Sequence, residues 1–360
     1  MEKEYIRRLE KIEALLRQEL PESPLSPWRS AVFANIPPVP ADLIRSLCAP
    51  GGDLLNRGGK RWRPLLMTLI CEALGGGDGA LPLVPLVEFP HNASLIHDDI
   101  EDNSDTRRGR PAVHLIYGTD TAINGGCFLY FLPLTCIETW PGGPERKNRI
   151  YQVWGEYMRR LHLGQAMDIS WHRNFNSQPE IETYYAMCGL KTGCLARLAA
   201  VLGVYVADAR LHGSSGGTVT SQGEVLAVEL GDAAEKLGVG FQILDDVKNL
   251  TTGNPGKKRG DDVAEGKKSL PVLLYLRGGG ERSRLVSRCF AAAREQGAAA
   301  AEVEELIAAL ETAGALEEAR EKGRTLVSEA GKAFGELPLT GFMEDAETRR
   351  LLVGLPRLIS

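Results

Sequence analysis

The sequence lacks the features that mark several protein classes. Its seven cysteines are odd in number and none stands in a CxxC pair, which argues against a disulfide framework and a zinc site. No stretch approaches about 18 uninterrupted apolar residues, so we expect no membrane span. The basic residues are dispersed and the formal net charge is -5, which indicates no binding to nucleic acid. The start, MEKEYIRRLEKIEALL, has no apolar signal core, so we expect a cytoplasmic protein.

The sequence also lacks runs of alternating β-branched residues with hairpin turn signals, which argues against an extensive β-sheet. Helical patterns alternate instead with short Gly- and Pro-rich breaks such as GGGDGALP and TWPGGPE. With 360 residues and 43% hydrophobic content, the chain can bury a large core. We therefore predict an all-α fold. A helix and a Pro-rich connector at residues 1–57 would pack on a single large helical domain at residues 58–360.

What the sequence does contain is an acidic cluster at the end of an apolar helix, in the stretch HNASLIHDDIEDNSDTRRGRPAVH at residues 91–114. Asp98, Asp99 and Asp102 stand at i, i+1 and i+4, so on a helix their carboxylates lie on one arc. Carboxylates held this close repel one another unless a cation lies among them. Oxygen ligands without thiolate or imidazole suit Mg²⁺. A solvated acidic helix end is the alternative for this cluster taken alone.

A second acidic pair, Asp245 and Asp246, closes another long amphipathic pattern in GVGFQILDDVKN. Two such helices can face each other across a bundle cavity, where metal sites are commonly built. Several separate segments also carry basic residues that can bind phosphate. They supply Lys60, Arg61 and Arg63 in GGKRWRP, Lys191 and Thr192 in KTG, and Lys257, Lys258 and Lys267 in GKKRGDDVAEGKK. Gln165 and Asp168 of GQAMD join them, whereas His162 and His172 are more simply packing or polar-contact residues. This set predicts a substrate load of two diphosphates with magnesium.

In this arrangement the chain resembles the trans-isoprenyl diphosphate synthases, or polyprenyl synthetases. The motifs that carry the resemblance are GGKRWRP, SLIHDDIEDNSDTRRG, GQAMD, KTG, GFQILDD and DDVAEGK, in the family's order from Gly58 to Pro271. The segments YGTDTAIN, YFL and LHLGQAMDISW are most similar to geranylgeranyl diphosphate synthases of the eukaryotic kind. The resemblance implies an all-α bundle with a deep central cavity and, usually, a homodimer.

The resemblance also implies a reaction and assigns residues to it. The reaction is a magnesium-dependent head-to-tail elongation that joins isopentenyl diphosphate to an allylic diphosphate. The implied magnesium ligands are Asp98, Asp99, Asp102, Asp245 and Asp246. The residues implied at the allylic diphosphate are Arg107, Lys191 and Lys257, with Thr192, Gln242 and Lys267 nearby. Those implied at isopentenyl diphosphate are Lys60, Arg63, His91 and Arg108.

A third set of residues concerns product length. Ala93 and Ser94 lie one helical turn before the acidic cluster and are small enough for a growing chain to pass. By resemblance, Tyr130, Phe131 and His162 form the floor of the product tunnel, so we expect elongation to stop at geranylgeranyl diphosphate. An ordinary aromatic core is the alternative reading of this set.

Other activities remain open at this stage. A longer-chain polyprenyl diphosphate synthase would share every motif. A terpene cyclase of the same fold usually replaces the second acidic motif with an Asn/Ser/Glu triplet, which is absent here. A non-catalytic partner subunit is expected to lose acidic ligands, whereas all five aspartates are present. The second motif ends in Asn249 rather than aspartate, as it does in the geranylgeranyl synthases that the chain resembles.

Overall fold

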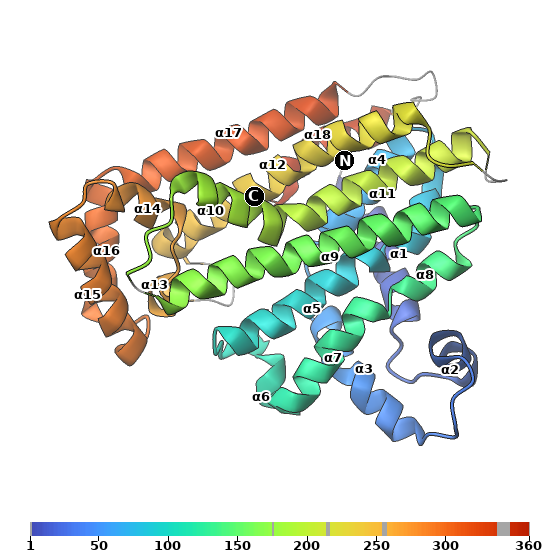
Figure 1. Ribbon diagram of the computed structural model, residues 1–360, viewed down its shortest axis with the longest axis horizontal. Coiled ribbons are helices and arrows are strands. Elements are labelled where there is room, and N and C mark those ends of the chain that lie inside the picture. The colour runs from blue at the N-terminus through green and yellow to red at the C-terminus, as the bar shows by residue number, and fades with distance from the viewer. Residues whose placement is uncertain (1, 175, 214–216, 254–257, 337–345, 360) are drawn as a thin grey trace. The chain divides into compact units, whose positions relative to one another are not determined.

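The computed structural model describes residues 2–174, 176–213, 217–253, 258–336 and 346–359. It is helical almost throughout (Figure 1), and the only strands in these ranges are β1 (Thr106–Arg107) and β2 (Arg110–Pro111). The predicted all-α fold is therefore confirmed. The chain forms two compact units. Unit 1 comprises Met1–Glu156, Arg197–Gly231 and Phe334–Leu355, and unit 2 comprises Tyr157–Ala196, Asp232–Ala333 and Pro356–Ser360. The predicted boundary separates an N-terminal segment at residues 1–57 from a main domain at residues 58–360. It does not correspond to the division into these two units, so it stays a prediction.

The helices are grouped here by unit. Unit 1 contains α1 (Glu2–Glu19), α2 (Ser26–Phe33), α3 (Ala41–Asn56), α4 (Trp62–Ala73), η1 (Gly77–Leu83), α5 (Pro85–Glu101), α6 (Val113–Tyr117), α7 (Thr119–Phe131) and α8 (Leu134–Thr139). Unit 2 contains α10 (Ile181–Cys188), η2 (Gly189–Gly193), α13 (Asp261–Glu265), α14 (Leu270–Leu276), α15 (Glu281–Gln296) and α16 (Ala301–Thr312). Residues of both units occur in α9 (Pro144–Arg173), α11 (Cys194–Leu211), α12 (Ser221–Thr251), α17 (Ala315–Gly335) and α18 (Ala346–Ile359).

Helix α5, which carries the first acidic cluster, continues through an internal proline. Pro90 has no N–H with which to bond the carbonyl of Leu86 four residues earlier. The indole N–H of Trp154 on α9 donates to that carbonyl instead, at 3.2 Å. The buried amide of Asn92 then donates to the backbone and side chain of Glu88, at 2.8 and 2.9 Å. Because these groups replace the missing bond and secure the next turn, the helix extends to the acidic cluster.

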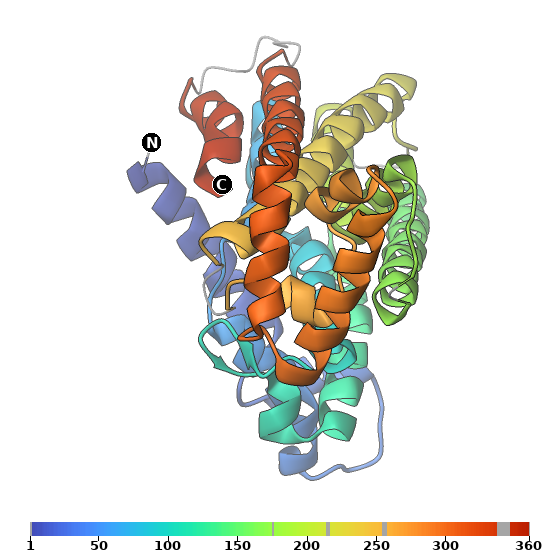
Figure 2. The same cartoon turned by 90° about the vertical axis from the view of Figure 1, so that its left-hand side faces the viewer.

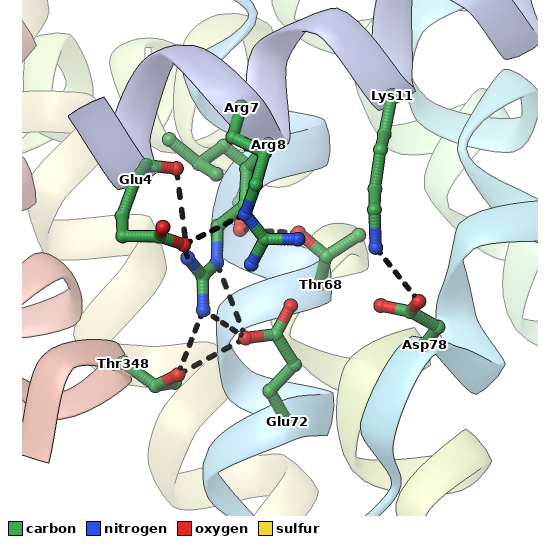
Figure 3. A network of polar contacts seen from close by, with 9 residues as sticks. Glu4, Arg7, Arg8, Lys11, Thr68, Glu72, Asp78 and Thr348 are labelled. Carbon is green, nitrogen blue, oxygen red and sulfur yellow. Dashed lines mark hydrogen bonds and ion pairs between the residues drawn. The ribbon is translucent and has the colours of Figure 1, made fainter. Parts of the chain in front are cut away.

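Helix α1 is tied into unit 1 by a buried arginine. Arg8 donates to Glu4 at 3.0 Å, to Glu72 of α4 at 2.8 Å and to Thr348 of α18 at 3.0 Å. Figure 3 shows this network, and Figure 2 shows α1 and α18, which come from opposite ends of the chain, side by side. Only 6% of Arg8 is exposed, so its charge depends on these partners.

One helical run within the described residues, Ile181–Leu211, is long and apolar enough to cross a membrane by length and composition. Most of its apolar window is buried inside the protein, and the core helix of a globular protein passes the same test.

Candidate active site

The first acidic cluster lies where α5 ends. Asp98 is partly exposed, Asp99 is fully buried, and Asp102 follows the last helical residue. The guanidinium of Arg107 reaches this cluster from β1. Its Nε donates to the two carboxylate oxygens of Asp99 at 2.9 and 3.1 Å, and its Nη2 lies 3.6 Å from Asp98 Oδ2. Two of the predicted metal ligands and one predicted diphosphate ligand are thus in contact within unit 1.

A short hairpin presents Arg107 on β1 and Arg108 in its two-residue turn. Thr106 pairs with Pro111 and Arg107 with Arg110, and the turn residues Arg108 and Gly109 have φ of 52° and 74°. Positive φ at both central residues is typical of a type I′ turn, which glycine adopts without strain and arginine does not.

Arg108 points to a different set of partners from Arg107. Its Nη1 donates to the carbonyl of Leu54 at the end of α3, at 2.8 Å, and to Asn92 Oδ1 at 3.3 Å. Burial, together with the nearby charge of Arg61, lowers the pKa of Arg108 to about 10. The hairpin therefore carries one arginine to the acidic cluster and the next arginine to the end of α3.

The segment GGKRWRP contains three cations that the structure places in different surroundings. Lys60 is exposed, whereas Arg61 and Arg63 are buried. Arg61 donates to Glu13 and to Glu88, both at 2.7 Å, so it holds α1, α5 and this segment together. It is a structural residue, unlike the two cations assigned to substrate.

Arg63 Nη1 lies 3.5 Å from His91 Nε2 on α5. Both residues are predicted to bind isopentenyl diphosphate. Burial, followed by the charges of Arg63 and Arg108, holds the pKa of His91 well below its usual range. His91 is therefore neutral near pH 7. It can contribute a hydrogen bond to a ligand but no charge of its own.

The second acidic pair lies on α12 in unit 2. Asp246 accepts hydrogen bonds from the hydroxyl of Tyr184 at 2.9 Å and from Gln242 Nε2 at 2.7 Å. Thr192 in turn donates to Gln242 Oε1 at 2.8 Å. Burial and the nearby charge of Asp262 raise the pKa of Asp246, so a bound cation would favour its charged form.

The motifs GQAMD and KTG meet at one close contact. KTG lies in the π-helix η2, a form that often marks a functional site. Lys191 Nζ is 2.5 Å from Asp168 Oδ2 on α9. A Cβ atom at Gly164 would lie 2.4 Å from the backbone nitrogen of Lys191, so only glycine lets α9 approach η2 this closely. This contact joins the two motifs within unit 2.

A further ionic group involves the predicted Lys267. Lys267 Nζ is 2.5 Å from Glu265 and 3.7 Å from Asp262. His172 is buried, and burial is the main cause that lowers its pKa, opposed by the charge of Asp168 and reinforced by that of Lys267. The prediction for His172 is a packing or polar-contact residue, and it lies near these charged groups.

Two residues that contact predicted site residues, Tyr184 and Arg57, had no clear signal in the sequence, and a third, Asn249, was known only as the end of the second acidic motif. Tyr184 supports Asp246, and Arg57 supports the hairpin, although neither belongs to a quoted motif. Asn249 is fully buried, and its Oδ1 accepts the backbone N–H of Asp262 at 3.3 Å. An aspartate at position 249 would place another negative charge beside Asp246 and Asp262, which gives a physical reason for asparagine.

The residues predicted to limit product length have mixed surroundings. Ala93 is buried, and the half-buried Ser94 donates to the carbonyl of His91 at 2.8 Å. Tyr130 is buried and stacks on His97, with ring centroids 5.8 Å apart. Phe131 is 67% exposed, so it packs little against its own chain. His162, in unit 2, is exposed, and its Nδ1 bonds the carbonyl of Met158 at 2.8 Å.

Two further points concern the predicted ligands. Lys257 lies outside the described residues. Among the residues that are described, no group of three or more His, Cys, Asp or Glu side chains is arranged to hold a metal ion by itself. The roles assigned to individual site residues therefore stay predictions.

Comparison with known proteins identifies the family. The family model "Polyprenyl synthetase" matches residues 45–310. The geranylfarnesyl diphosphate synthase of Aeropyrum pernix is 31% identical over 308 residues, which cover 83% of this chain and 89% of that one. The solved geranylgeranyl pyrophosphate synthetase from Pyrococcus horikoshii Ot3 is 28% identical, with a TM-score of 0.79 over 99% of this chain and 98% of that one.

A more distant solved structure shares the fold. It is the polyprenyl synthase from Caulobacter crescentus CB15, complexed with calcium and isoprenyl diphosphate. It is 22% identical, with a TM-score of 0.74 over 99% of this chain and 96% of that one. The family match spans most of the chain and contains both acidic clusters and the basic segments that follow them. The chain therefore belongs to the polyprenyl synthetase family and is a trans-prenyltransferase.

Proposed function

We propose that the enzyme condenses isopentenyl diphosphate with an allylic diphosphate, in magnesium-dependent head-to-tail elongation, to give geranylgeranyl diphosphate. The observation that supports this most directly is the end of α5, where Asp98 and Asp99 meet the guanidinium of Arg107. Negative groups for a metal and a positive group for a diphosphate are thus adjacent. We also propose that the enzyme acts in the cytoplasm and does not bind nucleic acid.

Magnesium fits the donor groups of the described residues. Asp98 and Asp99 offer oxygen ligands at the end of one helix, and Asp245 and Asp246 offer oxygen ligands on another. Burial, followed by the nearby charge of Asp262, raises the pKa of Asp246, and a divalent cation would favour its charged form. Magnesium is usually held by one or two carboxylates together with substrate phosphates, so a protein site of three ligands is not required. When bound, it would neutralise charge on the departing pyrophosphate.

The reaction breaks the allylic C–O bond, forms a C–C bond to the isopentenyl double bond, and releases a proton and pyrophosphate. In this proposal Arg107, Lys191 and Lys257 would hold oxygens of the allylic diphosphate, with Thr192, Gln242 and Lys267 nearby, and would stabilise its charge as the bond breaks. Lys60, Arg63 and Arg108 would hold isopentenyl diphosphate, with His91 as a neutral hydrogen-bonding partner. Pyrophosphate takes the proton in this proposal, so no side-chain base is assigned.

The decisive experiment incubates the purified enzyme with magnesium, isopentenyl diphosphate and farnesyl diphosphate, then extracts and sizes the products. We expect geranylgeranyl diphosphate. Longer diphosphates would identify a longer-chain synthase. The Aeropyrum pernix relative, for example, is named for geranylfarnesyl diphosphate, a slightly longer product. A cyclic hydrocarbon formed without consumption of isopentenyl diphosphate would identify a cyclase. The absence of any turnover would favour a non-catalytic subunit.

The tunnel floor gives a prediction about product length. Replacing Tyr130 and Phe131 together with alanine should shift the products beyond geranylgeranyl diphosphate, because two large side chains are removed. Tyr130 is buried against His97 whereas Phe131 is exposed, so we expect Tyr130 to limit product length more than Phe131 does. Tyr130→Ala alone should therefore lengthen the products, whereas Phe131→Ala alone should not. Chromatography of the dephosphorylated products measures the effect, and unchanged products from the double variant would place the floor elsewhere.

We also propose a homodimer that uses the outer face of α7. Ile123, Cys127 and Phe131 recur every four residues on this helix and are all exposed. An apolar stripe of this kind on one helix is typical of a surface that a partner covers. The family resemblance makes a second copy of the chain the expected partner.

The interface can be tested with a charged substitution. Ile123→Lys should convert dimers to monomers at micromolar concentration, because it places a charge within an apolar contact. Sedimentation velocity measures the change. Ile6→Lys is the matched control, since Ile6 on α1 is 47% exposed and Ile123 is 43% exposed. Dimers that persist in the Ile123 variant, or a monomeric wild-type enzyme, would contradict the proposed interface.

A further inference from the structure

Arg57 makes an unusual set of contacts at the end of α3. It is the first residue after this helix, and 1% of its side chain is exposed. Its Nε and Nη2 donate to the carboxylate of Asp53 at 3.3 and 2.7 Å. Its Nη1 donates to two backbone carbonyls, those of Arg107 at 3.0 Å and Pro111 at 2.9 Å. One buried guanidinium thus bonds both strands of the hairpin to α3.

The hairpin needs this outside support. Each strand is only two residues long, and an isolated two-stranded hairpin is marginally stable even when longer. Its turn also holds Arg108 at φ 52°, a backbone conformation that is unfavourable for a side chain other than glycine. The few ladder bonds between the strands offset little of this cost, so bonds from Arg57 to the strand carbonyls help to fix the turn.

The hairpin carries two arginines with different partners. Arg107 contacts Asp99 at the acidic cluster, and Arg108 contacts Leu54 and Asn92. These are adjacent residues, so a displacement of the hairpin backbone moves both guanidinium groups at once.

We propose that Arg57 is a positioning residue that fixes Arg107 and Arg108 together, and so sets affinity for both diphosphates through a single hairpin. The proposal rests on the proposed function for its assignment of Arg107 to the allylic substrate and Arg108 to isopentenyl diphosphate. It adds a residue that touches neither substrate in this scheme and belongs to none of the quoted motifs.

A neighbouring arginine provides a control for charge alone. Arg110 Nη1 also bonds Asp53, at 2.7 Å, but 56% of its side chain is exposed. Replacing either arginine with methionine removes one positive charge and one partner of Asp53. Only the Arg57 substitution removes the bonds to the hairpin carbonyls.

The experiment measures steady-state kinetics for Arg57→Met, Arg57→Lys and Arg110→Met. In Arg57→Met we expect the Michaelis constants for isopentenyl diphosphate and for the allylic substrate to rise together, each by roughly tenfold, the effect of about one hydrogen bond from a charged group. Arg57→Lys should be intermediate, since an ammonium group cannot reproduce the planar fork. Arg110→Met should stay within about twofold of wild type. Calorimetric titration with inorganic pyrophosphate and magnesium should show a parallel loss of affinity.

Several results would overturn the proposal. One is a change in only one Michaelis constant. Another is a fall in kcat that matches a smaller folded fraction, with both Michaelis constants and pyrophosphate affinity unchanged. Equal effects in Arg57→Met and Arg110→Met would attribute the result to charge. If Arg57→Met does not fold, Arg57→Lys decides by the same criteria. A wild-type enzyme that does not elongate would refute the proposed function, whereas elongation with normal affinities in the Arg57 variants would refute this inference alone.

Discussion

Asp98→Asn is expected to lower the rate of product formation by at least roughly 10²–10³-fold at saturating magnesium. Asp98 is partly exposed at the end of α5, next to the buried Asp99 and the guanidinium of Arg107. The substitution keeps the size of the side chain but removes a charged oxygen ligand. It should therefore reduce stabilisation of the departing pyrophosphate without disturbing the fold.

Asp105→Asn is the matched control for this prediction. Asp105 belongs to the same acidic run and its side chain is exposed, but it has no assigned role in the site. The two variants have the same net charge. We expect Asp105→Asn to keep nearly full turnover, and the magnesium concentration for half-maximal rate to rise in the Asp98 variant alone. Near-normal turnover in Asp98→Asn would remove this residue from the mechanism.

The second large effect concerns stability. Arg61→Met should lower the free energy of unfolding by roughly 3–5 kcal/mol, because it leaves a buried carboxylate without its partner. Arg61 and Glu88 have 1% and 2% of their side chains exposed, and Glu13 is the other carboxylate that Arg61 bonds. Chemical denaturation followed by circular dichroism measures the loss.

A second substitution tests the cause of this loss. In Arg61→Met, Glu88→Gln the buried negative charge is removed while an amide oxygen remains for Asn92, so part of the stability should return. Arg7→Met serves as the control, since the pair Arg7–Glu4 is exposed and such pairs contribute about 0–1 kcal/mol. A loss in Arg61→Met no larger than that in Arg7→Met would mean that the buried network contributes little.

The features that the sequence predicted well are local ones. The acidic residues at the end of α5 follow from spacing along one helix. Their contact with Arg107, eight positions from Asp99, was not predicted, since Arg107 was assigned to the diphosphate. The all-α fold and the family likewise follow from periodicity and from motif order, and both are confirmed. The individual roles in catalysis remain predictions, because they depend on substrates as well as on the chain.

Contacts between distant segments could not be predicted in the same way. In GGKRWRP, spacing and charge alone do not distinguish Arg61 from Arg63, and the partners Glu13 on α1 and Glu88 on α5 show that Arg61 is structural. The hydrogen bond from Trp154 to the carbonyl of Leu86, which Pro90 cannot bond, has no local signal in the sequence either. Tyr184 was missed for the same reason, since its partner Asp246 lies 62 positions away.

The contact between Arg8 and Thr348 has a consequence for synthesis of the chain. The two residues are 340 positions apart, and unit 1 includes segments from the beginning, middle and end of the sequence. Because translation proceeds at about 5–20 residues per second, Arg8 is made roughly 20–70 seconds before Thr348. During this time the buried network of Arg8 and Glu72 lacks Thr348, one of its hydrogen-bonding partners. Unit 1 can therefore become fully native only after Thr348 has left the ribosome.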